Sequence, residues 1–244
     1  MRFQGKVAVV VGGAGGIGYG ISKSLAEEGA TVIIWDNKSE VAEKAAHELA
    51  TKNKKAVAMT VNAMENDQVK QGVGKVISEH GKIDFMVCTV GGGVFRPTVN
   101  YDISFFQSQM DFNLLTVVNC FISVLPHMVE KQFGRMLCFT SALGGQPGLL
   151  AYQCGKAAVK SLIQTISAEH TKDHITVNAI MPAAVDTPLL RSAYNQAPNG
   201  EEYFNAMVAA LPLGINTVEN IAAEAMFILS DDAKRLTGQV FTNI

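Results

Sequence analysis

The chain has 244 residues, of which 48% are hydrophobic and 17% are charged, and its formal net charge is −2 at pH 7. This length fits one large α/β domain spanning residues 1–244 better than two small domains. The sequence contains no basic run, so neither nucleic acid nor an anionic membrane is an expected partner. The first apolar run is too short for a signal core or a membrane span, and we expect a cytoplasmic protein.

Strand and helix patterns alternate along the chain about every 30 residues, as repeated βα units do. Apolar runs predict strands at Val7–Val11, Thr31–Trp35, Ala56–Val61, Ile83–Cys88, Arg135–Thr140, Ile175–Ile180 and Gln239–Thr242. Amphipathic stretches predict helices at Ile17–Glu28, Ser39–Lys52, Asp67–Glu79, Ile103–Gln132, Tyr152–Thr171 and Val218–Leu229. Right-handed crossovers between these elements give a doubly wound, mostly parallel seven-stranded sheet with helices on both faces.

One stretch, Asp186–Gly214, interrupts this pattern and contains Pro188, Pro198 and Pro212. We predict that it is irregular, because proline disrupts helices and no clear periodicity replaces the pattern. Long breaks inside a compact domain are uncommon and usually carry function. We therefore expect a substrate loop near residues 186–214.

A glycine-rich segment joins the first predicted strand to the first predicted helix. Val11–Gly18 reads Val-Gly-Gly-Ala-Gly-Gly-Ile-Gly and fits both Gly-x-Gly-x-x-Gly and Gly-x-x-x-Gly-x-Gly spacing. Glycine lets the backbone approach a phosphate closely, and free N–H groups at the helix start favour an anion. A flexible turn is the alternative, but the strand before and the helix after match a Rossmann dinucleotide site. The predicted cofactor contacts here are Gly12, Gly15, Gly16, Ile17 and Gly18.

An acidic residue follows the second predicted strand. Asp36 lies 18 residues beyond Gly18, and dinucleotide folds hold a ribose hydroxyl with an acid about 20 residues after the glycines. Asp36 also suits the N-cap of the next helix, although Asn37 or Ser39 can cap that helix equally well. We therefore predict that Asp36 binds the ribose.

A tyrosine and a lysine share one face of the fifth predicted helix. Tyr152 and Lys156 are four residues apart, so the ammonium can lie near the phenol. A free tyrosine has a pKa of about 10, and Lys156 together with an oxidised nicotinamide would favour the phenolate. Tyr19 and Lys23 have the same spacing, but nothing catalytic accompanies them, and we interpret them as an ordinary helix face.

Two polar residues accompany Tyr152. Ser141 follows the predicted strand Arg135–Thr140, at the carboxyl edge where open α/β sheets place their sites. Asn113 lies within the long predicted helix before that strand. The alternatives are a turn hydroxyl for Ser141 and a satisfied helix amide for Asn113.

Together these pieces resemble the short-chain dehydrogenase/reductase family over almost the full length of the chain. The matching pieces are Gly12-x-x-x-Gly16-Ile-Gly18, Asp36, Asn113, Ser141, Tyr152-x-x-x-Lys156 and Asn178-Ala-Ile-Met-Pro182-Ala-Ala-Val185-Asp-Thr187. The resemblance implies that Tyr152 is the general acid–base and that Ser141, or alternatively Thr140, holds the substrate oxygen. It also implies that Lys156 binds the nicotinamide ribose and that Asn113 anchors a water relay.

The resemblance extends to the cofactor and to assembly. It implies further cofactor contacts from Asn62, Ala63, Val90, Gly91, Pro182, Val185 and Thr187. An acid at Asp36 implies NAD rather than NADP, because its charge would repel a 2′-phosphate. The family often forms homotetramers, so a homotetramer or homodimer is expected, with a hetero-oligomer as the alternative.

The chain departs from the family pattern at several positions. Val11 replaces a usual Thr, Asn62 a usual Asp and Ala183 a usual Gly, and Cys88-Thr-Val-Gly91 replaces a usual Asn-Asn-Ala-Gly. Those asparagines normally tie the centre of the sheet together, so the last change bears on local stability and on the cofactor pocket.

These observations predict an NAD-dependent oxidoreductase that transfers a hydride between the nicotinamide and a secondary alcohol or ketone. The alternatives are an NADPH-dependent 3-oxoacyl thioester reductase and a non-catalytic dinucleotide-binding subunit of a larger complex. An apolar or aromatic small molecule is the expected substrate, with Arg96 available for a carboxylate or a CoA phosphate. The predicted substrate contacts are Phe95, Arg96, Ser141, Leu149, Leu189 and Tyr194. Four scattered cysteines without C-x-x-C spacing indicate reduced thiols and no metal site.

Overall fold

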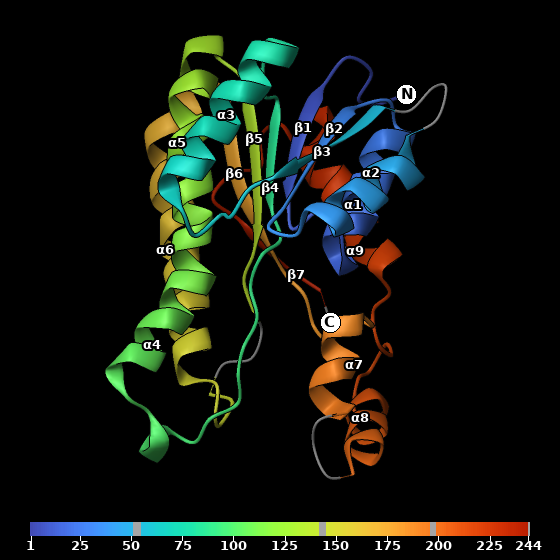
Figure 1. The fold of residues 1–244 in the computed structure, drawn as a ribbon, viewed down its shortest axis with the longest axis vertical. Helices are drawn as coiled ribbons and strands as arrows, with labels where there is room; N and C mark the ends of the chain where they lie inside the picture. The colour runs from blue at the N-terminus through green and yellow to red at the C-terminus, as the bar shows by residue number, and fades with distance from the viewer. Residues whose placement is uncertain (51–54, 142–144, 196–198, 244) are drawn as a thin grey trace.

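A seven-stranded sheet forms the centre of the computed structural model, which describes residues 1–50, 55–141, 145–195 and 199–243. Every strand pairs in parallel with its neighbours, in the order β3-β2-β1-β4-β5-β6-β7 (Figure 1). The strands are β1 (Val7–Val11), β2 (Thr31–Asp36), β3 (Lys55–Thr60), β4 (Phe85–Cys88), β5 (Gly134–Phe139), β6 (Ile175–Met181) and β7 (Val240–Thr242). The predicted doubly wound sheet is confirmed, and each strand end lies within two residues of its predicted position.

Helices cover both faces of this sheet. Alternate residues of β1 point to opposite faces, because side chains alternate along a strand. Val9 belongs to the core under one helical layer, and Ala8 and Val10 belong to the core under the other. The first layer contains α3 (Asn66–His80), α5 (Thr116–Lys131) and α6 (Leu150–His170), and the second contains α1 (Gly16–Glu27), α2 (Ser39–Leu49) and α9 (Val218–Leu229). Burial on both faces explains why the strands are almost continuously apolar.

The long predicted helix near Ile103–Gln132 consists of three consecutive helical segments. These are α4 (Ile103–Met110), a π-helical turn η2 (Asp111–Leu115) and α5. By length and composition the stretch Ile103–Lys131 could cross a membrane, but 44% of its most apolar window is buried inside the protein. Since Val117, Phe121 and Val124 of α5 pack into the core, the apolar character of this stretch has a structural explanation. The absence of a membrane partner stays a prediction.

The segment predicted to be irregular, residues 186–214, is mostly helical in its described part, so the predicted conformation was wrong. Its role in binding substrate stays a prediction. Within this segment lie α7 (Pro188–Asn195) and α8 (Gly200–Ala209). Pro188 occupies the first position of α7, where proline is favoured because its missing N–H would be unpaired there anyway. Thr187 precedes it, and its Oγ1 accepts a 3.2 Å hydrogen bond from the Leu190 N–H, as an N-cap does. Pro198 lies outside the described residues.

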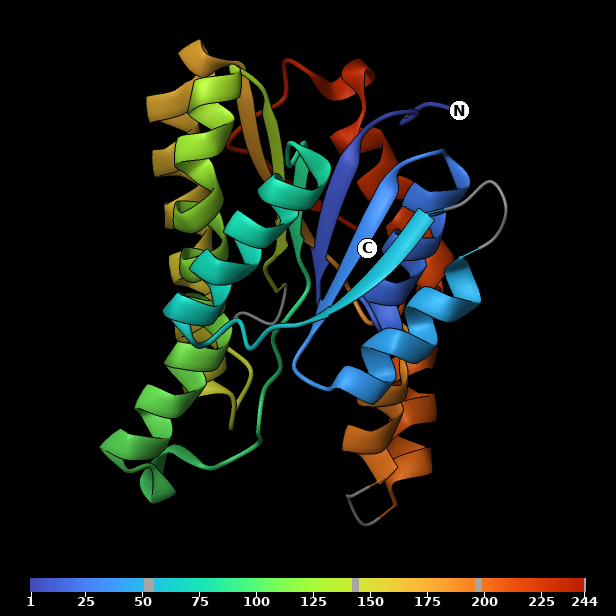
Figure 2. The same cartoon turned by 45° about the horizontal axis from the view of Figure 1, so that its top comes forward.

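These two helices extend beyond the sheet. Figures 1 and 2 both place α7 and α8 together at one side of the lower end of the molecule, with α4 at the other side. The described residues also contain the short 3-10 helices η1 (Thr98–Asn100), η3 (Thr171–Asp173) and η4 (Asp231–Ala233).

Candidate active site

The predicted site residues gather at one edge of the sheet. In a parallel sheet all carboxyl ends meet at the same edge, which is where open α/β folds bind ligands. The glycine segment follows β1, Asp36 ends β2, Ser141 follows β5 and Pro182 follows β6. The topology therefore brings residues from distant parts of the chain together.

The glycine segment has the geometry of an anion cradle. Gly12 and Gly16 have positive φ angles of 72° and 49°, which side-chain-bearing residues rarely adopt. A Cβ atom on Gly18 would collide with the carbonyl oxygen of Gly12, so α1 can approach the loop only with glycine there. Gly15 caps α1 without a side-chain hydrogen bond, and a Cβ placed on it would meet nothing within 4 Å. Open space in front of uncapped helix N–H groups fits a dinucleotide diphosphate.

Thr89 ties this cradle to the neighbouring strand. Its hydroxyl donates to the carbonyl oxygens of Val11 at 2.8 Å and Gly12 at 3.3 Å. In the altered Cys88-Thr-Val-Gly91 segment, Thr89 therefore links the end of β4 to the end of β1 at the centre of the sheet. The sequence did not lead us to predict this role of Thr89. Its signal was that asparagine is replaced by another residue that can form hydrogen bonds. Val90 lies beside the same loop, since a Cβ on Gly12 would approach Val90 Cγ2 to 3.2 Å.

Asp36 is half-buried at the end of β2 and forms a local turn. Its Oδ1 accepts a 3.2 Å hydrogen bond from the Lys38 N–H. No hydrogen bond to Oδ2 occurs within the described part of the chain, so that oxygen remains available for a ribose. Asn62 makes a similar turn after β3, where its Oδ1 accepts from the Met64 N–H at 3.1 Å, and Ala63 beside it is buried.

Tyr152 lies near the start of α6 (Leu150–His170), with its phenol hydrogen-bonded to Ser141. Burial raises the pKa of Tyr152 above its ordinary value, and the hydrogen bond with Ser141 opposes that change. In the chain alone burial prevails, so the phenol is protonated at neutral pH. A further positive charge is needed to favour the phenolate.

Lys156 occupies the same face of α6, one turn further on. Its Nζ donates a 3.0 Å hydrogen bond to the carbonyl oxygen of Phe139 and lies 5.9 Å from the centre of the Tyr152 ring. Burial lowers the pKa of Lys156, while the neighbouring thiols Cys138 and Cys88 oppose that change. A buried ammonium with one carbonyl partner is costly to maintain unless it serves another purpose.

Asn113 lies within the π-helical turn η2, and such turns are frequent at functional sites. Its side-chain amide makes two hydrogen bonds to the backbone of Gly92 in the loop after β4. Nδ2 donates to the Gly92 carbonyl at 2.9 Å, and Oδ1 accepts from the Gly92 N–H at 3.0 Å. The same Nδ2 also donates to the Gln109 carbonyl at 3.0 Å. A Cβ on Gly91 would lie 2.6 Å from Lys156 Nζ, so this loop passes closely over the lysine.

The two candidate residues for holding the substrate oxygen differ in their surroundings. Ser141 is half-buried and contacts Tyr152 through a hydrogen bond. Thr140 is 6% exposed, and its Oγ1 is buried without a hydrogen-bond partner among the described residues. This geometry favours Ser141, because its hydroxyl is directed to the phenol.

The segment after β6 approaches the glycine cradle. The side chain of Thr187 would be 3.6 Å from a Cβ on Gly16, which places the two segments in contact. Val185 is buried and pairs with Asn216 in an isolated parallel bridge. Sequence positions separated by most of the chain therefore line one site.

Several of the predicted substrate residues lie near the segments that carry the catalytic residues. The Arg96 N–H donates to the Gly148 carbonyl at 2.9 Å, which places Phe95 beside the start of α6. Leu189 of α7 would approach a Cβ on Gly92 to 3.8 Å, and Leu149 would approach a Cβ on Gly93 to 2.7 Å. Tyr194 packs edge-to-face against Phe204 of α8, with 5.5 Å between the ring centres.

Arg96 already has two partners. Its guanidinium lies 3.6 Å from the centre of the Phe105 ring and 3.4 Å from a carboxylate oxygen of Asp102. A negatively charged substrate group would have to compete with Asp102 for this side chain. The remaining predicted substrate contacts are apolar or aromatic, apart from Ser141.

Comparison with known proteins agrees with this arrangement. Residues 6–198 match the short chain dehydrogenase family, and the chain belongs to that family. It is 32% identical to the 3-oxoacyl-[acyl-carrier-protein] reductase FabG of Chlamydia muridarum (strain MoPn / Nigg), over 97% of this chain and 95% of that protein. It is 30% identical to 2,3-dihydroxy-2,3-dihydro-p-cumate dehydrogenase of Pseudomonas putida, over 99% of this chain and 94% of that protein.

A solved structure shows the same architecture with ligands. This is 7α-hydroxysteroid dehydrogenase complexed with NADH and 7-oxo glycochenodeoxycholic acid, with a TM-score of 0.91 and 25% identity. The similarity covers 99% of this chain and 93% of that one. The chain is therefore an oxidoreductase of the short chain dehydrogenase family with a site for a nicotinamide dinucleotide.

Proposed function

We propose that this protein is an NAD-dependent dehydrogenase that interconverts a secondary alcohol and the corresponding ketone. The observation that carries the proposal is the hydrogen bond between the Tyr152 phenol and Ser141, with the Lys156 ammonium 5.9 Å from the same ring. A proton donor, a hydroxyl that can hold an oxygen and a buried cation are the groups that carbonyl reduction needs.

The residues present fit a dinucleotide. The cradle of Gly12, Gly16 and Gly18 would hold the diphosphate, and Asp36 would bind the adenosine ribose through the carboxylate oxygen left outside its local turn. A carboxylate at this position supports NAD, because a 2′-phosphate would meet a like charge. The bound NADH named for the 7α-hydroxysteroid dehydrogenase structure is consistent with that choice.

The protein's own groups handle the proton. When bound, the nicotinamide would supply or accept the hydride. In ketone reduction Tyr152 donates its phenolic proton to the carbonyl oxygen, while the Ser141 hydroxyl holds that oxygen in place. In alcohol oxidation Tyr152 takes the hydroxyl proton instead, so the oxidative direction is favoured as the pH rises. Lys156 stabilises the phenolate formed in reduction through its positive charge.

The surroundings of the site support an apolar or aromatic substrate. Phe95 and Leu189 are 63% and 66% exposed, and such large apolar side chains at a site entrance suit an apolar ligand. Leu189 lies next to Gly92 and Phe95 lies next to Gly148, both near the catalytic residues. A cytoplasmic location and a homodimer or homotetramer stay predictions.

An NADPH-dependent 3-oxoacyl thioester reductase is the second candidate, and the similarity to the Chlamydia muridarum reductase favours it. It would use the same Asn113, Ser141, Tyr152 and Lys156. The binding of Arg96 by Asp102 and Phe105 weighs against a phosphate-bearing substrate at that point. A non-catalytic dinucleotide-binding subunit is a poorer fit, because a module without turnover has no need of the buried Lys156 or of a Tyr152–Ser141 hydrogen bond.

The test is a thermal-shift titration with NAD⁺, NADH, NADP⁺ and NADPH. A ligand at 100 times its Kd adds about 2.7 kcal/mol to the free energy of unfolding, which is readily measured. We expect stabilisation by NAD⁺ and NADH and a much smaller effect of the phosphorylated pair. Preferential stabilisation by NADPH would instead promote the thioester reductase.

One variant tests the negative charge of Asp36 separately from the hydrogen bond that Asp36 makes in its local turn. Asp36→Asn keeps an oxygen that can accept the Lys38 N–H but removes the negative charge. We expect this variant to gain affinity for NADP⁺ while it retains its fold. Unchanged discrimination against NADP⁺ would show that Asp36 is not the selector.

A further inference from the structure

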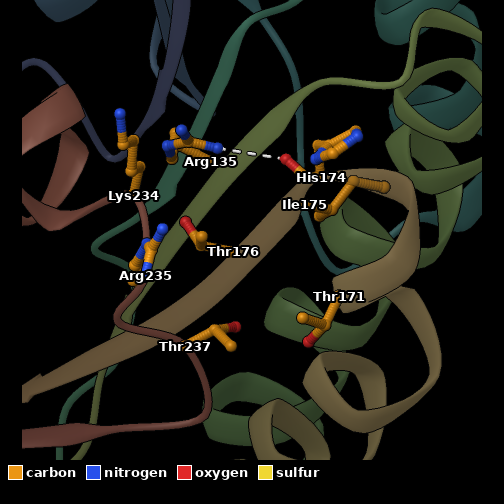
Figure 3. A pocket seen from close by; sticks show the side chains of 8 residues that line it. All are labelled: Arg135, Thr171, His174, Ile175, Thr176, Lys234, Arg235 and Thr237. Atoms are coloured by element: carbon orange, nitrogen blue, oxygen red, sulfur yellow. Dashed lines mark hydrogen bonds between the residues drawn. The ribbon is translucent and has the colours of Figure 1, made fainter.

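A cavity lies at the opposite edge of the sheet from the catalytic residues. Its volume is about 410 Å³, within the range of small-molecule sites. The cavity is lined by Arg135, Thr171, His174, Ile175, Thr176, Lys234, Arg235 and Thr237 (Figure 3). Arg135 and Ile175 stand at the amino ends of β5 and β6, whereas Ser141 and Pro182 follow the carboxyl ends. Since β5 has six residues, roughly 20 Å of strand separates the two sites.

The lining is strongly cationic. Arg135, Lys234 and Arg235 carry positive charge, and His174 is beside them. Asp231 forms an ion pair with Arg135, 3.8 Å from its Nη2, and the Asp231 side chain is 84% exposed to solvent. Within the described residues neither Lys234 nor Arg235 forms an ion pair. The positive charge of the cavity is therefore poorly compensated by the protein.

Arg135 is held in the wall of this cavity although it is only 5% exposed. Its Nη1 donates to the carbonyl oxygens of Gly134 at 3.0 Å and His174 at 3.1 Å. Its Nε is buried without a hydrogen-bond partner among the described residues. Burial lowers the pKa of Arg135, and Asp231 only partly opposes that change. A buried guanidinium with so few partners is expensive to keep charged, and an anion in the adjoining cavity would offset that cost through its charge.

Thr176 adds a hydroxyl at the same place. Arg135 and Thr176 are register partners on adjacent parallel strands, so their side chains project from the same face of the sheet. Thr176 is 5% exposed, and its hydroxyl makes no hydrogen bond to any residue that the structure describes. Figure 3 shows it beside Arg235 and on the same side of the cavity as Arg135. By contrast, the hydroxyls of Thr171 and Thr237 are bonded to Ser167 at 2.6 and 2.9 Å.

We infer that this cavity, defined by Arg135, Thr176, Lys234 and Arg235, binds the phosphate group of a small phosphorylated molecule. Guanidinium groups form strong charge-assisted hydrogen bonds with phosphate oxygens, and lysine adds a point charge. The cavity is larger than one inorganic phosphate requires, so the space beyond the cations suits the rest of a phosphate ester or a second phosphate. This inference concerns a site separate from the catalytic one and does not depend on the proposed reaction.

The experiment is isothermal titration calorimetry with inorganic pyrophosphate and, separately, with glucose 6-phosphate. Because the glycine cradle also suits a diphosphate, the titrations use a Gly15→Glu background. Gly15 has an extended backbone, and a side chain there meets open space, so the added carboxylate repels anions from the cradle without a steric clash. We expect both probes to bind this background, and binding of pyrophosphate alone would identify the free anion as the source.

Two charge-matched double variants locate the binding. Lys234→Gln/Arg235→Gln removes two cations from the cavity, and Lys44→Gln/Lys160→Gln removes two exposed cations elsewhere. Loss of direct charge-assisted bonds should weaken binding roughly tenfold or more in the first variant only. Thr176→Val should weaken it by a smaller factor without a change in charge. Equal losses in the two double variants, or no binding to the Gly15→Glu background, would overturn the inference.

Discussion

Two tyrosine–lysine pairs with identical spacing occur in this chain, and only one has the surroundings of a catalytic pair. Tyr19 and Lys23 lie on α1, where the phenol donates to a carboxylate oxygen of Glu48 at 3.1 Å and the lysine is exposed. Lys156, by contrast, is 6% exposed, and the Tyr152 phenol bonds to Ser141. Spacing places two side chains on one helix face, but tertiary burial decides what they can do.

The largest expected effect is a loss of turnover, and it should occur when Tyr152 is changed but not when Tyr19 is changed. Tyr152→Phe should lower kcat/KM on a secondary alcohol by ~10²–10⁴-fold, because the group that moves the proton is lost. Stabilisation by NAD⁺ in a thermal-shift assay should remain. The control, Tyr19→Phe, removes an exposed hydrogen bond to Glu48 and should leave turnover unchanged. Wild-type turnover by Tyr152→Phe would remove the assignment.

A smaller effect on turnover is expected when the Ser141 hydroxyl, the partner of the Tyr152 phenol, is removed. Ser141→Ala should lower kcat by about 10²-fold, as the loss of one hydrogen-bond donor to a reacting oxygen typically does. It should also raise the pKa of Tyr152 further, since the hydrogen bond that lowers that pKa is gone. Glu48→Gln removes the charge beside Tyr19 and serves as the control. If Thr140→Val impairs turnover and Ser141→Ala does not, Thr140 holds the substrate oxygen.

The two lysines should differ in how stability depends on pH. Burial lowers the pKa of Lys156, so the unfolded chain binds more protons than the folded chain between that lowered value and about 10.4. Stability contributed by Lys156 therefore rises with pH through this window. The free energy of unfolding of wild type minus that of Lys156→Met, from urea titrations at several pH values, should increase accordingly. Lys23→Met gives the reference curve, and parallel curves for the two variants would contradict this account.

Much of the fold followed from local patterns. Strands buried on both faces read as short apolar runs, and the glycine segment and Asp36 lie where they were predicted, at the carboxyl ends of the first two strands of a parallel sheet. The α7 helix was missed because Pro188 was read as a breaker, whereas proline at a first helical position starts a helix. The decisive information was position within the helix rather than residue type.

The details of the site were harder to predict because they depend on contacts between distant segments. Nothing local to Thr89 indicates that its hydroxyl will reach the Val11 and Gly12 carbonyls. The partners of Arg96 and the π-helical turn at Asn113 also arise from packing. The cationic cavity joins the starts of two strands to residues near the C-terminal strand, so no single sequence window contains it.

The most direct measurement of the central claim is a titration of the Tyr152 phenol by its near-ultraviolet phenolate absorbance. The spectrum of Tyr152→Phe is subtracted from that of wild type, with and without NAD⁺. Without the cofactor, burial should hold the pKa of Tyr152 above its ordinary value of about 10. With NAD⁺ the pKa should fall, because Lys156 and the positive nicotinamide then act together on the phenol. A Tyr152 pKa that does not change when NAD⁺ binds would contradict its role as the acid–base group.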